Sequence, residues 1–170
     1  MASTYTPIAT TTLGSNQSSV TFSSISGAYT DLIVVMNGKN GSATNTDINF
    51  KLNSDSGDPY SFTYLYGNGT VAASGRVSNY PNGRVGYYTT PGTTDGYMAI
   101  VQFMNYSNTT TNKTIISRGS SNSSNTTYPG TETIVNLWRS TSAITSIAFN
   151  SPSSSFATGF TFTLYGVKSA

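Results

Sequence analysis

The stretch GYMAIVQFMNY, residues 96–106, decides the fold class of this chain. Its side chains fall into two alternating sets. The first set is Tyr97, Ala99, Val101 and Phe103, and the second is Met98, Ile100, Gln102 and Met104. A period of two residues is typical of a β-strand, because successive side chains of a strand point to opposite faces of the sheet. The stretch therefore predicts a long β-strand.

Segments of the same kind recur along the whole chain. We predict further strands at residues 19–25, 31–37, 47–53, 60–67, 112–118, 132–140, 144–150 and 159–167. Thr, Val, Ile, Tyr and Phe dominate these segments, which is strand chemistry, and no window offers a convincing amphipathic helix. Clusters of Gly, Asn, Ser and Pro lie between the segments. These clusters predict turns and loops, because such residues adopt positive φ or bind their own backbone.

Two regions depart from the alternating pattern. Residues 31–37, DLIVVMN, form a continuous apolar run, which predicts a strand that is buried on both faces. Residues 67–96 have weak periodicity and several Gly-containing turns, and we interpret them as a long excursion between sheets. Loops of that length in a compact domain often contact a neighbouring molecule.

Together these segments predict an all-β fold. About nine strands in a chain of 170 residues favour a single-domain antiparallel β-sandwich of the jelly-roll type, with an up-and-down barrel as the second choice. We place the sandwich domain at residues 19–170. Residues 1–18 are rich in Thr and Ser around Pro7 and predict an extended N-terminal arm. Such an arm either frays or docks on another subunit.

The composition argues against catalysis. The chain contains no Cys and no His, which removes the thiolate and imidazole groups that many enzymes and metal sites use. Its six carboxylates show no pairing of the kind that a glycosidase needs. Asp55 and Asp58, in NSDSGDPY, favour a polar turn over a calcium site. We therefore predict a protein that is not an enzyme, with no catalytic, cofactor-binding or metal-binding residues.

The charge pattern narrows the class of partner. Charged residues make up 8% of the chain, against a usual ~25%. The eight basic residues are scattered, which disfavours a nucleic-acid partner. No apolar stretch approaches the ~20 residues of a membrane span, and the start of the chain lacks the features of a secretory signal. We expect cytoplasmic synthesis, no membrane insertion, and a surface of hydroxyls and amides that suits a component of an assembly.

The twelve tyrosines include the first candidates for binding. Tyr, Ser, Asn and Gly are the residues of adaptable protein-binding loops, and carbohydrate-binding faces use the same set. The loop residues Tyr80, Tyr87 and Tyr88 are therefore predicted to contact a partner. The tyrosines of residues 60–67 share one face of a strand, and we predict that they cover an edge of the core instead.

The single tryptophan, Trp138, lies next to Arg139 in the sequence. Alternation along residues 132–140 places the two side chains on opposite faces, so they cannot form one patch. If Val135 and Leu137 face the core, Trp138 points outward and is a candidate contact residue. If Trp138 faces inward, it packs in the core or at its rim.

Five blocks of the sequence resemble a group of small β-rich virion proteins of tailed bacteriophages. The blocks are YTPIATTTLGSNQSSVTFSSISGAYTDLIVV, KLNSDSGDPYSFTYLYGNG, NYSNTTTNKTIISR, NLWRSTSAITSIAF and FATGFTFTLYGVKSA, and they span the chain from about residue 5 to its end. The resemblance implies a non-enzymatic structural protein of the virion, made in the cytoplasm of the bacterial host. It carries no catalytic residues to transfer.

The resemblance leaves the position on the particle open. We expect a capsid decoration or cement protein, bound to the major capsid protein or other virion proteins and assembled as a dimer or trimer. Tyr5, Pro7 and Ile8 of the arm are the predicted attachment residues, in addition to the tyrosines and Trp138. The alternative is a tail fibre or tail-tip component that binds a host surface glycan. A cell-wall glycan hydrolase is the remote alternative.

Overall fold

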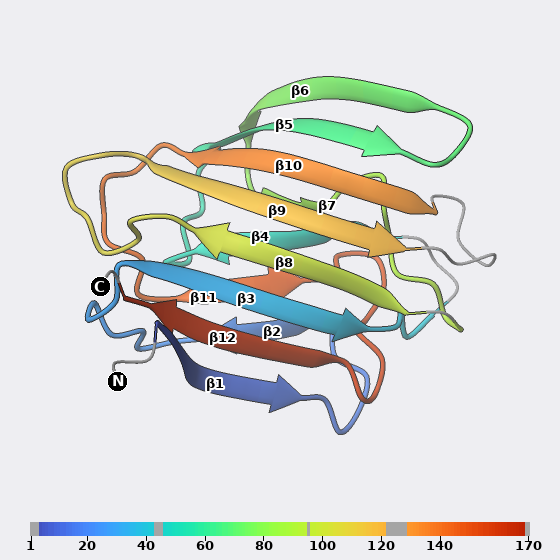
Figure 1. The fold of residues 1–170 in the computed structure, drawn as a ribbon, viewed down its shortest axis with the longest axis horizontal. Helices are drawn as coiled ribbons and strands as arrows, with labels where there is room; N and C mark the ends of the chain where they lie inside the picture. Colours follow the sequence, from blue (N-terminus) through green and yellow to red (C-terminus); the bar gives the residue numbers. More distant parts are fainter. Residues whose placement is uncertain (1–3, 43–45, 95, 122–128, 169–170) are drawn as a thin grey trace.

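The computed structural model describes residues 4–42, 46–94, 96–121 and 129–168, and every regular element in these ranges is a β-strand (Figure 1). The strands are β1 (Tyr5–Thr12), β2 (Ser19–Phe22), β3 (Asp31–Gly38), β4 (Ile48–Leu52), β5 (Tyr60–Gly67), β6 (Ala72–Tyr80), β7 (Gly83–Gly86), β8 (Tyr97–Phe103), β9 (Lys113–Ser121), β10 (Gly130–Trp138), β11 (Ile147–Asn150) and β12 (Thr161–Val167). The predicted all-β class is therefore confirmed. The described part of the chain holds no helix long and apolar enough to span a membrane.

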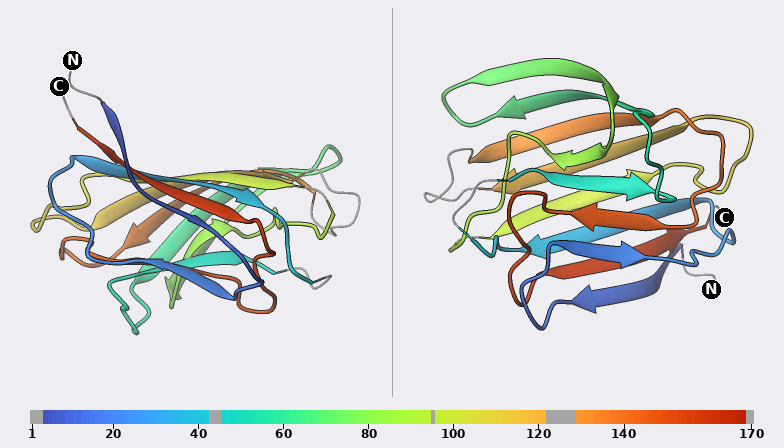
Figure 2. Two further views of the ribbon diagram at one scale, coloured as in Figure 1. Left: turned by 90° about the horizontal axis from the view of Figure 1, so that it is seen from below. Right: turned by 180° about the vertical axis from the view of Figure 1, so that it is seen from behind.

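The strands form two antiparallel sheets that pack face to face (Figure 2). The larger sheet has eight strands in the order β1-β12-β3-β8-β9-β10-β5-β6, and the smaller has four in the order β2-β11-β4-β7. No strand of one sheet pairs with a strand of the other within the described ranges, so the sheets form a sandwich and do not close into a barrel. The jelly-roll connectivity stays a prediction.

The two alternating sets of β8 lie on opposite faces of the sheet, and the set that contains Tyr97 faces the core. Tyr97, Val101 and Phe103 have no exposed surface, whereas Met98 keeps 47% of its surface exposed. The continuous apolar run of β3 behaves differently from the prediction. Its residues alternate between buried and partly exposed positions, so only one face of β3 lies in the core. The other face of β3 belongs to the solvent side of the large sheet, where no second layer of described residues covers it.

Aromatic side chains fill the space between the two sheets. Phe50 of the small sheet contacts Tyr60 and Phe103 of the large sheet edge to face, with ring centroids 6.0 and 5.6 Å apart. A second group at β11, β12 and the segment between them consists of Phe149, Phe156, Phe160 and Phe162. Burying each such ring contributes about 2–3 kcal/mol to the free energy of unfolding. Packing of these rings is the main interaction that holds the two sheets together.

The predicted N-terminal arm is extended, and it pairs within its own chain. Tyr5–Thr12 forms β1, an edge strand of the large sheet that pairs with β12 along its whole length. The register shifts between Pro7 and Ala9, which leaves Ile8 as a bulge residue. Leu13 directly after β1 is 3% exposed and belongs to the core. Residues 4–18 are therefore part of the sandwich.

The region 67–96, interpreted from the sequence as an excursion between sheets, contains two strands. β6 is the second edge strand of the large sheet, and β7 is an edge strand of the small sheet. The sequence of β6, AASGRVSNY, shows no regular apolar alternation, because the residues paired with Tyr64 and Tyr66 of β5 are the small Gly75 and Ala73. Large side chains of β5 lie over those small residues. The sequence of β6 alone does not reveal that such a neighbour exists.

Candidate functional site

The free edge of β7 faces the large sheet, and polar side chains of that sheet bind its main chain. Asn136 of β10 accepts a hydrogen bond from the N–H of Arg84 at 2.8 Å and donates one to the carbonyl oxygen of Arg84 at 2.9 Å. The hydroxyl of Ser117 on β9 donates to the carbonyl oxygen of Val85. Asn136 and Ser117 have no exposed surface. These side chains take the place of a neighbouring strand. They provide hydrogen-bond partners for main-chain N–H and C=O groups that would otherwise be unpaired at the edge of the sheet.

Glu132 of β10 fixes the turn that follows β7. Its Oε2 atom accepts hydrogen bonds from three consecutive N–H groups, those of Tyr87, Tyr88 and Thr89, at 2.9, 2.9 and 3.0 Å. Glu132 is 2% exposed. Burial raises the pKa of its carboxyl group above the ordinary value, although the three N–H groups act in the opposite direction. One buried carboxylate therefore holds the backbone that carries two tyrosines.

Arg84 of β7 binds the surrounding side chains through its guanidinium group. The group forms an ion pair with Asp47 and donates hydrogen bonds to Asn49 at 2.6 Å and to the hydroxyl of Tyr80 at 2.6 Å. Its central carbon lies 4.7 Å from the ring centroid of Tyr80 and 5.1 Å from that of Tyr87. These are cation–π distances. The buried guanidinium thereby fixes the positions of two tyrosine rings from their inner side.

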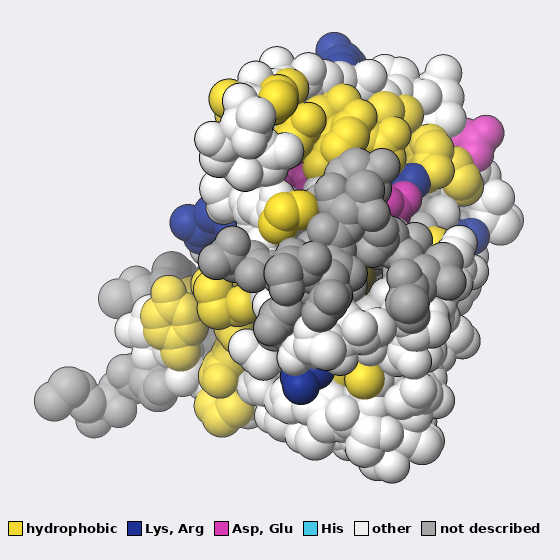
Figure 3. Space-filling view, turned by 90° about the vertical axis from the view of Figure 1, so that its right-hand side faces the viewer, with side chains coloured by type: hydrophobic (Ala, Val, Ile, Leu, Met, Phe, Trp, Pro, Cys, Tyr) yellow, Lys and Arg dark blue, Asp and Glu magenta, His cyan; other side chains and the backbone are white. Residues whose placement is uncertain are grey.

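These contacts gather five partly exposed tyrosines into one group, which we call the tyrosine cluster: Tyr64, Tyr66, Tyr80, Tyr87 and Tyr88. The rings of Tyr66 and Tyr88 stack with centroids 4.5 Å apart and an angle of 10° between their planes. Tyr64 lies 5.0 Å from Tyr88, and Tyr88 lies 4.8 Å from Tyr87. Figure 3 shows a contiguous patch of hydrophobic and aromatic side chains at the top of this side of the molecule, where β5 and β6 lie, with charged groups beside it.

Small residues on β6 make room for the cluster. A Cβ atom at Gly75 would collide with the hydroxyl end of Tyr64, so the Tyr64 ring lies directly over the glycine backbone. Ala73 is paired with Tyr66 in the same way. The β5–β6 hairpin thus presents aromatic rings on a flat support.

The solvent side of the large sheet is a second candidate surface, which we call the outer face. Antiparallel sheets usually place polar residues on a solvated face. On the outer face, two rows of paired residues cross the central strands and are largely apolar. The first row is Tyr165, Ile33, Gln102, Ile116 and Val135, and the second is Val35, Ile100, Arg118, Thr133 and Leu65. Leu65 and Val135 keep 62% and 44% of their surface exposed.

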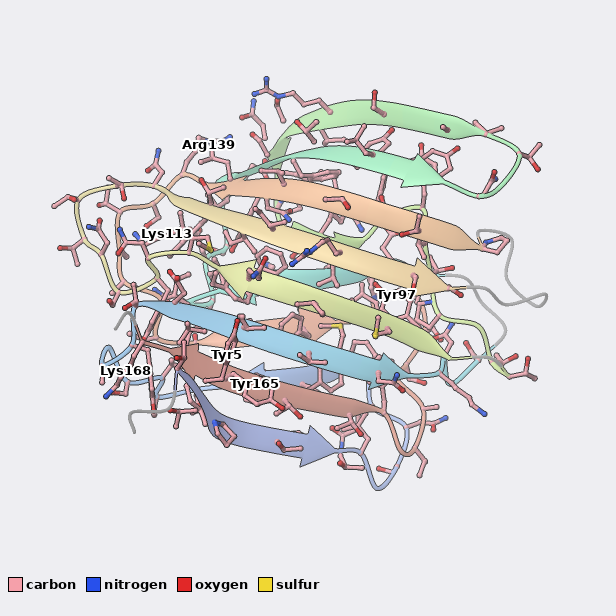
Figure 4. All side chains as sticks on the ribbon, in the orientation of Figure 1. Tyr5, Tyr97, Lys113, Arg139, Tyr165 and Lys168 are labelled. Carbon is pink, nitrogen blue, oxygen red and sulfur yellow. The ribbon has the colours of Figure 1, made fainter. Side chains whose placement is uncertain are left out.

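Shallow hollows lie on the outer face, and two of them flank the rows of apolar residues. One, of about 360 Å³, lies at the β1 end between Tyr5 and Tyr165, both labelled in Figure 4, and its lining includes the amide of Gln102. The guanidinium of Arg118 donates a hydrogen bond to that amide at 3.0 Å. The other hollow, of about 540 Å³, lies at the β5–β6 end and includes Leu65 in its lining. Each hollow adjoins apolar residues of the two rows, and each has one basic or acidic residue in its lining, Arg118 in the first and Glu132 in the second.

The contact residues predicted from the sequence lie in three different places in the structure. Tyr80, Tyr87 and Tyr88 come together in the tyrosine cluster, joined by two strand tyrosines that we had predicted to cover a core edge. From the N-terminal segment, Tyr5 and Pro7 lie on the strand next to Tyr165, and Ile8 lies at the bulge with 36% of its surface exposed. Trp138 lies in the core.

Trp138 follows the inward alternative that the sequence left open. It is 1% exposed, stacks on Tyr60 with centroids 6.5 Å apart, and donates its indole N–H to Asp55 at 2.9 Å. Arg139 points to the other side and donates to Asn79 at 2.9 Å. The predicted separation of Trp138 from Arg139 is therefore confirmed. In this position Trp138 presents no ring to a partner.

The buried ionisable residues that hold the tyrosine cluster are not among the contact residues predicted from the sequence. A signal for one of them was present, because Glu132 and Asn136 share the alternation parity of Trp138. Once Trp138 is placed inward, both of these polar residues must be inward as well. Lys113 is another buried cation, and its ammonium group donates to the carbonyl oxygens of Thr111 and Thr141 at 2.8 and 3.1 Å.

The fold and its surfaces define an all-β sandwich with two candidate binding faces, a tyrosine cluster and an apolar outer face. Among the described residues, no group of three or more Asp, Glu, His or Cys side chains could hold a metal ion. No family model, curated protein or solved structure matches the chain.

Proposed function

We propose that this protein is a non-enzymatic structural component of a tailed-bacteriophage virion that decorates the capsid. In this proposal the outer face of the eight-stranded sheet docks on the major capsid protein. The resemblance of five sequence blocks to phage virion proteins supports the class of particle, and the outer face supports the mode of attachment.

The observation that carries the proposal is the apolar character of the outer face. Leu65 and Val135 are exposed on β5 and β10, and apolar residues of β3, β8 and β9 continue the surface. A broad exposed apolar surface on a soluble domain is typical of a protein–protein interface. Charged side chains are few on this face, where Arg118 is bonded to Gln102, so docking would bury few charged groups.

Decoration would stabilise the shell by mass action. A protein that binds across subunits of the assembled capsid, and not to free subunits, lowers the free energy of the assembled state alone. This mechanism needs no catalytic group. It is consistent with the structural use of the buried charges around β7, where Glu132 and Arg84 bind main-chain and side-chain groups of the same domain.

The docking test uses particles that lack the protein, to which the purified chain is added back. We expect Leu65→Glu combined with Val135→Glu to abolish co-sedimentation with the particles. The matched control is Thr21→Glu, because Thr21 is exposed on β2 of the opposite sheet. Docking through the outer face is wrong if the double variant co-sediments as well as the control does.

A tail fibre or tail-tip component is the second candidate, and the tyrosine cluster favours it, since an exposed aromatic patch suits recognition of a host surface. The number of copies per particle separates the two locations. On the order of hundreds of copies would indicate the shell, whereas about a dozen or fewer would indicate the tail.

A further inference from the structure

The tyrosine cluster has the geometry of a stacking platform for a ligand. Tyr66 and Tyr88 are stacked almost in parallel, and Tyr64 and Tyr87 pack around Tyr88 at centroid distances of 5.0 and 4.8 Å. All four rings keep part of their surface exposed. Aromatic rings provide a large contact area and retain few rotatable bonds, so binding to them costs little side-chain entropy.

The platform is held rigidly by buried charged groups. Glu132 fixes the backbone of residues 87–89 through three hydrogen bonds, and Arg84 contacts the rings of Tyr80 and Tyr87. A site whose contact residues are positioned before binding gains affinity, because less conformational freedom is lost on association. These contacts therefore favour a binding function for the cluster over simple coverage of the core.

Polar groups at the edge of the platform indicate the kind of ligand. The side chain of Asp47 is 31% exposed, while the Arg84 side chain that orients it is 4% exposed. The charge that this ion pair presents to solvent is thus a carboxylate, which accepts hydrogen bonds from hydroxyl groups. The tyrosine hydroxyls add donors and acceptors, and Tyr64 already donates to Tyr88 at 3.4 Å.

We propose that the tyrosine cluster is a binding site for a neutral glycan. A pyranose ring has an apolar C–H face that packs on an aromatic ring and a rim of hydroxyls that hydrogen-bond to a carboxylate. The partly exposed carboxylate of Asp47 disfavours phosphate and acidic sugars at this edge, because like charges repel and its Arg84 partner is buried beneath it. This also disfavours single-stranded nucleic acid, which otherwise stacks on aromatic side chains but needs basic groups for its backbone.

The proposal does not depend on docking through the outer face, and its test uses the purified chain alone. Affinity electrophoresis in gels that contain dextran, starch, galactomannan or yeast mannan provides the neutral probes, with polygalacturonate as the acidic probe. We expect at least one neutral probe to retard the protein and polygalacturonate to leave its mobility unchanged. Tyr66→Ala and Tyr88→Ala should each weaken the retardation about tenfold, whereas Tyr66→Phe keeps the ring and should retain it.

The matched control is Tyr5→Ala, because Tyr5 is a more exposed tyrosine, at 57%, on the outer face. It should bind as the unmodified protein does, and circular dichroism should show that all variants are folded. The glycan proposal is overturned if no neutral probe retards the protein, if Tyr66→Ala and Tyr88→Ala bind normally, or if Tyr5→Ala abolishes binding. Binding of a single-stranded oligonucleotide that is lost in Tyr66→Ala would overturn it in favour of base stacking.

Discussion

Replacing Glu132 by alanine removes the single acceptor that holds three N–H groups. Thr89 is 1% exposed, so its N–H loses its partner with no access to water, whereas Tyr87 and Tyr88 are partly exposed. A buried donor left without a partner costs about 1–3 kcal/mol. Loss of the buried carboxylate recovers part of its desolvation cost, and we expect Glu132→Ala to lower the free energy of unfolding by about 3 kcal/mol.

Urea unfolding at neutral pH, followed by Trp138 fluorescence and by far-UV circular dichroism, measures this change. Coincident transitions in the two signals would establish two-state unfolding, on which the comparison of free energies depends. Glu132→Gln is the control, because its amide oxygen still accepts the three N–H groups. A loss below about 1 kcal/mol in Glu132→Ala, or equal losses in both variants, would refute the assigned role of the carboxylate.

The pH dependence gives an independent check on Glu132. Burial raises the pKa of this carboxyl group in the folded protein. The part of its contribution that comes from proton binding is therefore complete below the pKa of an unfolded Glu and is lost as pH rises through the higher folded pKa. The hydrogen bonds that Glu132 accepts from three N–H groups are a separate contribution. The unmodified protein should lose stability relative to Glu132→Gln as pH rises above the ordinary pKa of a Glu side chain. A difference that is constant with pH would contradict this expectation.

Three further predictions concern other parts of the domain. Asn136→Ala removes both hydrogen bonds to the Arg84 main chain and should lower the free energy of unfolding, measured by urea denaturation, by about 2 kcal/mol. An unchanged free energy would contradict the role of Asn136 in linking the two sheets. Gly75→Val should displace the Tyr64 ring and reduce the near-UV circular dichroism of the tyrosines, and an unchanged spectrum would show that the ring does not lie over Gly75. Trp138 should emit at short wavelength and resist iodide quenching because it is 1% exposed, and efficient quenching would place it at the surface.

Local alternation was sufficient to predict the elements in which one face is apolar. It divided the side chains of β8 into two sets on opposite faces and separated Trp138 from Arg139, and both features are present in the structure. These predictions succeeded because strand geometry alone fixes which side chains share a face. The depth to which each face is buried is a separate property, as Ile33 and Val35 on the outer face of β3 show.

The edge strands and the tyrosine cluster depend on contacts that are distant in the sequence. β6 has small residues where it pairs with Tyr64 and Tyr66 of β5, so its own sequence carries no regular apolar alternation. The pairing of β1 with β12 joins the two ends of the described chain. Similarly, Glu132 acts on the turn after β7 from another strand, and no local pattern indicates which backbone a buried carboxylate will bind.

The most direct test of the proposed function is the copy number of this protein in purified particles of the phage that, under this proposal, encodes it. Quantitative mass spectrometry against isotope-labelled peptides, normalised to the major capsid protein, supplies the number. A capsid decoration protein should be present at on the order of hundreds of copies per particle. About a dozen copies or fewer would contradict decoration of the capsid and favour the tail, and absence from the particle would contradict a structural role in the virion.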